Sequence, residues 1–212
     1  MSLQRQKELI KDMDIQEFNR REAIAKSLVS STLRVCDGFP KKGVLFADFN
    51  KAFAQAKTLK NLIEFFAAVY PKEDYSIVLA PEARGFILGP AIAFAAGGAF
   101  IPARKQGKLP NFDTLESFSY STEYSEATID VDSSCFTEAI CRNVNTLGLK
   151  NIVVYDDVLA TGGTAQACLE AAKSHGLGAK FIFLYEISSL KGREALINTG
   201  VKETEIYSLI KV

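Results

Sequence analysis

The stretch Val153–Ala165, VVYDDVLATGGTA, passes from an apolar strand into a turn of small residues and then into a helical pattern. In open α/β sheets, ligands bind beyond the carboxyl ends of the strands, where such a turn lets the backbone approach an anion. The N–H groups of Thr161–Thr164 and the dipole of the following helix favour a phosphate. However, two carboxylates, Asp156 and Asp157, stand directly before the turn. The ligand must therefore combine an anion with hydrogen-bond donors.

A ribose that carries a 5′-phosphate has both features. Its 2′- and 3′-hydroxyls donate hydrogen bonds to carboxylates, and its phosphate accepts them from backbone N–H groups. No Lys follows the glycines, as a GxxxxGK[ST] loop would require, and the chain contains no GxGxxG. These absences disfavour nucleoside triphosphate loops of the Walker type and Rossmann dinucleotide sites. The motif predicts a site for a 5-phosphoribosyl group.

On both sides of this motif, short apolar strands alternate with helical stretches, which is typical of a parallel sheet covered by helices. The predicted strands are 44–49, 75–80, 99–104, 151–156 and 179–187, and the predicted helices are 58–70, 85–96, 163–175 and 190–198. Residues 1–34 mix both charges on a loose helical pattern, and we expect one or two surface helices there. The expected organisation is an N-terminal helical extension, 1–34, followed by the main domain, 35–212.

Composition places the chain among ordinary globular proteins. It has 212 residues, of which 48% are hydrophobic, and its 25 Lys and Arg balance its 25 Asp and Glu, so no overall charge favours nucleic acid or a membrane surface. The four cysteines include no CxxC pair and His175 is the single histidine, which disfavours a Cys/His zinc site and indicates a reduced, cytoplasmic protein. His175 precedes Gly176, so we expect it to end a helix rather than to act in catalysis.

Two stretches need separate interpretation. Residues 85–103 carry no charge, but Pro90, Gly97–Gly98 and Pro102 divide them, and we expect a short buried helix, a tight turn and a core strand rather than a membrane span. Residues 105–132 are polar and too long for an ordinary connection. The alternation over 118–131 predicts a hairpin that carries a mobile loop.

The thirteen residues Val153–Ala165 resemble, along their full length, the phosphoribosyl-pyrophosphate binding motif of type I phosphoribosyltransferases. Further segments resemble the adenine phosphoribosyltransferases in sequence and order: FPKKGVLF (39–46), PEARGFILGPAIA (81–93), ARKQGKLP (103–110), STEYS (121–125) and SLKGREAL (189–196). The resemblance covers roughly residue 39 to the C-terminus. It implies the type I fold, a central parallel sheet flanked by helices with a small hood lobe and a mobile catalytic hairpin.

The resemblance also implies roles for individual residues on the phosphoribosyl and pyrophosphate sides. Asp156 and Asp157 hold the ribose hydroxyls. The 5′-phosphate is wrapped by one continuous stretch, Ala160, Thr161, Gly162, Gly163 and Thr164. The pyrophosphate binds to a loop that contains Glu82, Ala83 and Arg84, in which the Glu82–Ala83 bond is cis. Further cations contact it from the next strand and turn: Arg104, Lys105 and Lys108. Cations suit this place because negative charge builds on the departing pyrophosphate.

For the base, the resemblance implies that Glu123 gives or takes a proton at N7 of adenine, with Tyr124 closing over the site and Arg84 as a further catalytic group. The adenine slot is formed by a hood and one residue beneath it: Leu45, Phe46, Ala47 and Leu159. This chain departs from the family pattern at Ala47, where an Arg usually precedes the Asp. It also departs at Asn111, where Gly often stands, and at 133–150, a long connection in which we expect an extra helix.

The implied reaction transfers the 5-phosphoribosyl group from phosphoribosyl pyrophosphate to adenine and gives AMP and pyrophosphate, with a homodimer as the assembly. Mg²⁺ is the implied cofactor because it takes most ligands from substrate oxygens and water, with Asp156 as the candidate protein ligand. Two alternatives stay open: a transferase for another purine base, because of Ala47, and a non-catalytic regulator that binds phosphoribosyl pyrophosphate. The regulator would need a basic DNA-binding face, and residues 1–34 offer little of one.

Overall fold

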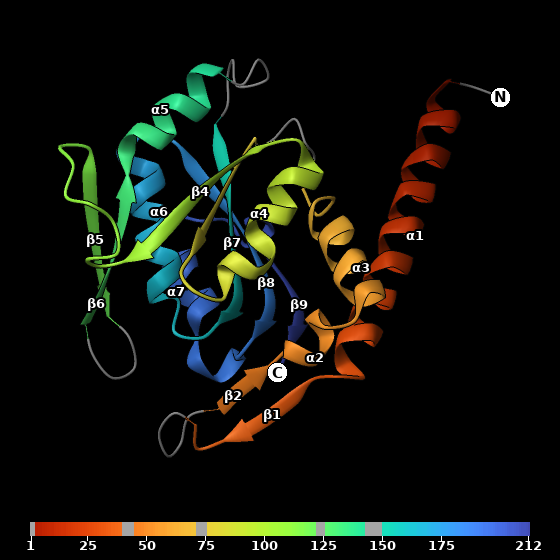
Figure 1. The fold of residues 1–212 in the computed structure, drawn as a ribbon. Coiled ribbons are helices and arrows are strands. Elements are labelled where there is room, and N and C mark those ends of the chain that lie inside the picture. The colour runs from red at the N-terminus through yellow and green to blue at the C-terminus, as the bar shows by residue number, and fades with distance from the viewer. Residues whose placement is uncertain (1–2, 40–44, 71–75, 122–125, 143–149) are drawn as a thin grey trace. The chain divides into compact units, whose positions relative to one another are not determined.

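Figure 1 presents the computed structural model of the chain, which describes residues 3–39, 45–70, 76–121, 126–142 and 150–212. The chain divides into two compact units, Met1–Phe65 and Phe66–Val212. The boundary lies inside a helix and is later in the chain than the end of the predicted N-terminal extension at residue 34. The division into an extension and a main domain stays a prediction.

The first unit is mainly helical. Its elements are α1 (Leu3–Ser30), β1 (Arg34–Asp37), β2 (Leu45–Asp48), α2 (Asn50–Phe53) and α3 (Ala56–Phe66). The expected one or two N-terminal helices are a single long helix, α1. The ring of Phe18 on α1 lies 5.3 Å from the ring of Phe65 on α3, and this contact joins the two longest helices of the unit.

The strand expected at 44–49 is present as β2, but it does not join the central sheet. It pairs antiparallel with β1 in a separate two-stranded sheet, where Val35 lies opposite Ala47. Grouping this segment with the parallel strands is therefore wrong. The connection 38–44 between the two strands is long enough for an antiparallel pair and too short for the crossover that parallel strands require.

The second unit contains the central sheet and the helices that flank it. Its strands and helices are β3 (Ile77–Pro81), α4 (Gly85–Ala96), β4 (Ala99–Lys105), β5 (Leu115–Ser121), β6 (Glu126–Asp132), α5 (Ser133–Arg142), β7 (Asn151–Leu159), α6 (Gly163–Ser174), β8 (Gly178–Glu186), α7 (Gly192–Asn198) and β9 (Ile206–Lys211). The seven strands lie in the order β5-β6-β4-β3-β7-β8-β9. Strands β4, β3, β7, β8 and β9 run parallel, and the hairpin β5–β6 adds antiparallel to β4 at one edge (Figure 1).

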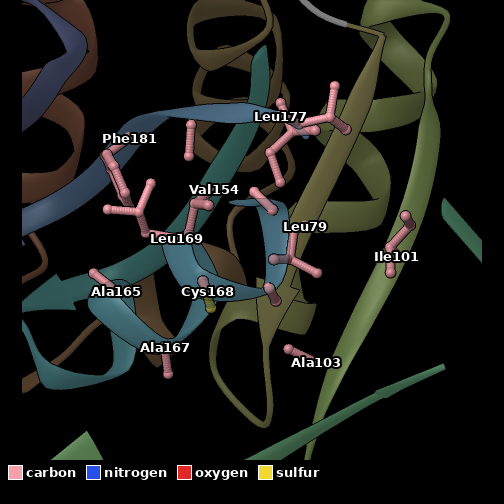
Figure 2. Packing of buried hydrophobic residues seen from close by; sticks show 14 of the residues in the cluster. Leu79, Ile101, Ala103, Val154, Ala165, Ala167, Cys168, Leu169, Leu177 and Phe181 are labelled. Atoms are coloured by element: carbon pink, nitrogen blue, oxygen red, sulfur yellow. The ribbon is translucent and has the colours of Figure 1, made fainter. Parts of the chain in front are cut away.

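Continuous apolar runs explain why β3 and β7 lie in the middle of the sheet, where helices cover both faces. All five residues of β3 are buried, and so are residues 152–155 of β7, as expected for parallel strands covered on both faces. Figure 2 shows Ala165, Cys168 and Leu169 of α6 packed beside the sheet in the same buried cluster as Leu79 and Val154. This packing fixes α6, and with it the turn that precedes α6, on the carboxyl end of β7.

Most predicted elements of this unit are confirmed, with shifts of a few residues at their ends. The hairpin expected within 118–131 is β5–β6, and the extra helix expected within 133–150 is α5. Strand β9 was not predicted from the sequence. Helix α6 ends at Ser174 with His175 as its C-cap and Gly176 at φ 72°, which confirms a helix-ending place for the histidine.

The charge-free stretch 85–103 forms α4, a turn at Gly97 and the start of β4, as expected. The expectation that all of it is core is wrong for α4. Leu88 and Ile92 are buried, whereas Ile87 and Phe94 are 43% and 88% exposed, because the sheet covers one side of this helix. Pro90 lies inside the helix rather than near a break. No helix that the structure describes has both the length and the apolar content needed to cross a membrane.

Candidate active site

A small pocket lies at the carboxyl end of β7 and the start of α6. Nine of its lining residues are contiguous or nearly so in the chain, and one comes from β8: Asp156, Val158, Leu159, Ala160, Thr161, Gly162, Gly163, Thr164, Ala165 and Phe183. The pocket thus unites the expected phosphate loop with the first acid of the expected pair. It lies beyond the carboxyl end of a central parallel strand, where ligands of open α/β sheets bind.

The turn into α6 has the backbone geometry of an anion cradle. Gly162 is the N-cap of α6 and has φ 87°, a left-handed conformation that favours glycine. Helix bonding begins when Gln166 N–H donates to the carbonyl of Gly162, so the preceding N–H groups of the first turn have no partner within the helix. These groups and the helix dipole favour a phosphate in the pocket.

Neighbouring backbone packs directly against this loop. A Cβ atom on Gly163 would lie 2.2 Å from the carbonyl oxygen of Ser121, at the end of β5. A Cβ atom on Gly192, at the start of α7, would lie 2.3 Å from the carbonyl oxygen of Ala160 and 2.9 Å from the nitrogen of Gly162. Glycine is therefore required at these places by close backbone approach, and the loop is held between the hairpin and α7.

The two acids have different surroundings. Asp156 lines the pocket, and one of its carboxylate oxygens accepts a hydrogen bond from the backbone N–H of Asp157 at 2.9 Å. The side chain of Asp157 is buried, and its Oδ2 lies 3.2 Å from Nε of Arg84, at the start of α4. Arg84 thus reaches from the end of β3 to the end of β7, which are neighbouring strands of the sheet.

Burial makes both acids weaker than usual. It raises the pKa of Asp157 to about 6, against the opposing effect of the Arg84 guanidinium. Burial and the nearby Asp157 carboxylate raise the pKa of Asp156 well above its usual range. Hydroxyl groups that donate to a carboxylate favour its ionised form, so a ribose diol is a ligand that would relieve part of this cost.

The expected pyrophosphate side lies at the ends of β3 and β4. The peptide bond Glu82–Ala83 is cis, as the resemblance implies. The Glu82 carboxylate accepts hydrogen bonds from Nε of Arg104 at 2.9 Å and from the backbone N–H of Lys105 at 3.1 Å, and the Arg104 guanidinium holds the pKa of Glu82 below its usual value. Lys105 ends β4 and Lys108 lies in the turn that follows, and both are exposed. The structure therefore places Glu82 as a partner of the cations.

No family model matches the chain. The adenine phosphoribosyltransferase of Salinispora arenicola is 41% identical to it over 180 residues, which cover 84% of this chain and 89% of that protein. The adenine phosphoribosyltransferase of Natranaerobius thermophilus is 39% identical over 176 residues, which cover 82% of this chain and 96% of that protein. The chain belongs to the adenine phosphoribosyltransferase family.

Solved adenine phosphoribosyltransferases have the same fold. That of Thermoanaerobacter pseudethanolicus matches with a TM-score of 0.73 at 33% identity, covering 88% of this chain and 99% of that chain. That of Giardia lamblia, solved in complex with 9-deazaadenine, matches with a TM-score of 0.72 at 30% identity, covering 87% of this chain and 96% of that chain. The resemblance read from the sequence is confirmed, and as an adenine phosphoribosyltransferase the chain is an enzyme of the pentosyltransferase class.

Several expected site residues are not among the residues that line the pocket. Glu123 and Tyr124 lie outside the described residues. Leu45, Phe46 and Ala47 form β2 in the first unit, while Leu159 is buried and lines the pocket in the second. The assignment of the hood and of the acid–base pair stays a prediction.

Other pocket residues of the adenine phosphoribosyltransferase were missed in the sequence. Val158 lies between two expected ligand residues and Ala165 follows the last of them, so their places within the thirteen-residue motif were a usable signal. Phe183 enters because β8 pairs with β7 so that Phe183 lies opposite Asp156. No local sequence pattern shows which residue of β8 lies opposite Asp156, so Phe183 could not be predicted. Among the residues that the structure describes, no group of three or more His, Cys, Asp or Glu side chains could hold a metal ion.

Proposed function

We propose that this chain transfers the 5-phosphoribosyl group from phosphoribosyl pyrophosphate to adenine, giving AMP and pyrophosphate in purine salvage. The pocket that joins Asp156 to the loop Thr161–Thr164 carries the proposal, because one ligand with a diol and a 5′-phosphate satisfies both parts. Relatives at 41% and 39% identity have the name of this activity. The Saccharomyces cerevisiae relative, 26% identical, was solved with adenine, and adenine is accordingly the proposed acceptor here.

Binding begins with the sugar. The N–H groups and hydroxyls of Thr161–Thr164 hold the 5′-phosphate, and the carboxylates of Asp156 and Asp157 accept hydrogen bonds from the ribose hydroxyls. Arg84 keeps the Asp157 carboxylate in place through their 3.2 Å contact. Two fixed ends orient the ring, so that its C1 atom meets the base in a productive geometry.

In the reaction, the bond from C1 to the pyrophosphate oxygen breaks and a bond from C1 to N9 of adenine forms. Positive charge develops on the ring and negative charge on the leaving group. Arg104, Lys105 and Lys108 stabilise the pyrophosphate as it departs. Glu123 accepts the proton from N7 of adenine as the bond to N9 forms, and Tyr124 closes over the site and excludes water.

Mg²⁺ is the proposed cofactor. Asp156 fits it, because this carboxylate lines the pocket next to the expected phosphate and diol positions, and Mg²⁺ usually takes one or two carboxylates together with substrate oxygens and water. When bound, the ion would neutralise charge on the pyrophosphate. The four cysteines are free thiols, which supports a place in the reducing cytoplasm.

A homodimer is the proposed assembly. Helix α4, GFILGPAIAFAA, is apolar on every side, and such helices are normally covered on every side. In the single chain Ile87 and Phe94 are 43% and 88% exposed. A second copy packed on this helix would remove that apolar surface from water.

A base panel tests the proposed function. The protein is incubated with phosphoribosyl pyrophosphate, Mg²⁺ and one base at a time: adenine, hypoxanthine, guanine, xanthine or orotate. We expect turnover with adenine. Turnover with another purine and not with adenine would favour the second candidate, which Ala47 motivates because the family usually has Arg there. Tight binding of phosphoribosyl pyrophosphate without turnover of any base would instead identify a regulator.

A further inference from the structure

Asp130 on β6 is a buried acid that the reaction described above does not use. It is 2% exposed, and it is not among the residues that line the pocket. In the sheet it lies opposite Arg104 of β4 on one side and opposite Ser117 of β5 on the other. A buried carboxylate is costly unless it is hydrogen-bonded, so its contacts indicate what it stabilises.

Both carboxylate oxygens of Asp130 accept hydrogen bonds. Oδ2 accepts from the backbone N–H of Gly107 at 2.8 Å, and Oδ1 accepts from the hydroxyl of Ser117 at 2.7 Å. Gly107 has φ 75° and lies between Lys105 and Lys108, the exposed cations proposed to meet pyrophosphate. One carboxylate therefore binds the turn of the cationic loop and the first strand of the hairpin at the same time.

One further bond holds the same turn against the hairpin, and another closes the turn itself. The N–H of Gln106 donates to the carbonyl of Thr128 on β6 at 3.1 Å, and the N–H of Lys108 donates to the carbonyl of Lys105 at 3.1 Å. Among these bonds, the one to Asp130 has a charged acceptor, and such bonds are stronger than those between neutral groups. Its negative charge also lies beneath a loop that concentrates positive charge.

We propose that Asp130 is a positioning residue for pyrophosphate. It does not touch the substrate; it fixes the Gly107 turn so that Lys105 and Lys108 are presented together, and through Ser117 it ties this turn to the hairpin whose connection contains Glu123. The inference rests on the proposed function, since it assigns Lys105 and Lys108 to the leaving group. According to this proposal, Asp130 affects how tightly the Lys105–Lys108 turn binds pyrophosphate, although Asp130 lies outside that turn.

Kinetics of Asp130→Ala test the role. Loss of a hydrogen bond to a charged group changes a binding constant by a factor of roughly ten or more. We therefore expect KM for phosphoribosyl pyrophosphate and the inhibition constant of pyrophosphate to rise about tenfold. KM for adenine should change less than about twofold. Asp130→Asn should fall between, because its amide oxygen can still accept from Gly107 while its NH₂ group donates to the Ser117 hydroxyl. Equal effects on adenine and phosphoribosyl pyrophosphate would overturn the proposal.

Ser119→Ala is the matched control. Ser119 lies on the same hairpin, and its hydroxyl is 3.0 Å from that of Thr128, so the variant removes a cross-strand bond without touching the Gly107 turn. We expect wild-type constants for it. If Ser119→Ala and Asp130→Ala were equally impaired, the effect would belong to hairpin stability and not to positioning.

Two measurements keep the inference separate from the proposed function. Amide hydrogen exchange of Gly107 should be faster in Asp130→Ala than in wild type and unchanged in Ser119→Ala. Binding of pyrophosphate alone, followed by calorimetry, should weaken in parallel. Should Asp130→Ala fail to fold, Ser117→Ala and Asp130→Asn serve for both measurements. Unchanged exchange at Gly107 would refute the positioning role even in an active enzyme, whereas an inactive wild type would refute the proposed function alone.

Discussion

Glu186 and Arg193 form the most enclosed ion pair among the described residues, with side chains 5% and 13% exposed. Arg193 donates from Nη2 to Glu186 at 2.7 Å and from Nη1 to the carbonyl of Ile206 at 2.9 Å. Burial alone would raise the pKa of Glu186, but hydrogen bonds from Arg193 and Ser208, together with the positive charges of Arg193 and Lys211, lower the pKa overall. A group whose pKa is lower in the folded state stabilises the fold above its unfolded pKa and loses this contribution as pH falls through the folded value.

We expect Glu186→Gln to lower the free energy of unfolding by about 3 kcal/mol at pH 7, because it leaves the guanidinium of Arg193 buried without its counter-charge. The difference from wild type should shrink as the pH falls below the unfolded pKa of about 4.3 and then through the lower folded pKa, because the wild-type carboxyl then becomes protonated. Urea unfolding followed between pH 7 and pH 3 measures this. Glu194→Gln lies on α7 beside Arg193, with its side chain 68% exposed, and should differ little from wild type at any pH. A gap for Glu186→Gln that stays constant with pH would contradict the assignment.

Glu123 is a prediction from sequence resemblance, and kinetics can test it directly. Loss of a general acid or base typically lowers a rate 10²–10⁴-fold, so Glu123→Gln should reduce kcat by about this factor with a modest change in KM. Asp157→Asn should act differently and mainly raise KM for phosphoribosyl pyrophosphate. Glu126→Gln, an exposed neighbour on β6, is the control and should keep wild-type constants. Full activity in both Glu123→Gln and Asp157→Asn would disprove the site assignments.

The turn between β7 and α6 depends on α7, an element distant in the chain. Arg193 and Glu186 fix the start of α7 against β8, and the adjacent Gly192 backbone then packs on the phosphate loop. Gln166 of α6 adds a second link, since its side chain donates to the carbonyl of Ala195 at 3.1 Å. The conformation of the loop is therefore set by the packing of α7 as well as by its own sequence.

Gly192→Ala tests this dependence. Its Cβ would come within 2.3 Å of the Ala160 carbonyl oxygen, and backbone can yield only by shifting the loop. We expect a lower Tm and a KM for phosphoribosyl pyrophosphate raised several-fold, with KM for adenine nearly unchanged.

Gly98→Ala is the matched variant for Gly192→Ala, because its Cβ would meet the Ser76 carbonyl oxygen at 2.7 Å near the amino end of β4, away from the pocket. It should lower Tm without changing KM. If the two variants changed KM for phosphoribosyl pyrophosphate equally, the effect would be one of general stability.

A feature of the fold or site could be predicted from the sequence when the residues that form it are contiguous in the chain. The motif Val153–Ala165 is contiguous, and short apolar runs marked β3, β4, β7 and β8, so the central strands and the phosphate loop could be found from sequence. Phe183 and Asp130 could not, because they reach their partners through the register between strands, which no local pattern around these two residues shows. The pairing of β2 with β1 and the exposed side of α4 likewise depend on which surfaces meet, not on local pattern.

The exposed side of α4 leads to a prediction for the assembly. Phe94 is 88% exposed on a helix without a polar residue, so a second copy of the chain should cover it. We expect wild type to sediment as a dimer at micromolar concentration and Phe94→Glu to shift towards monomer, since the dimer would then bury an unpaired charge. Phe112→Glu, the same change at a residue 58% exposed after β4, should leave the dimer intact. A wild type that sediments as a monomer, or a Phe94→Glu variant that remains fully dimeric, would exclude α4 as the contact between copies.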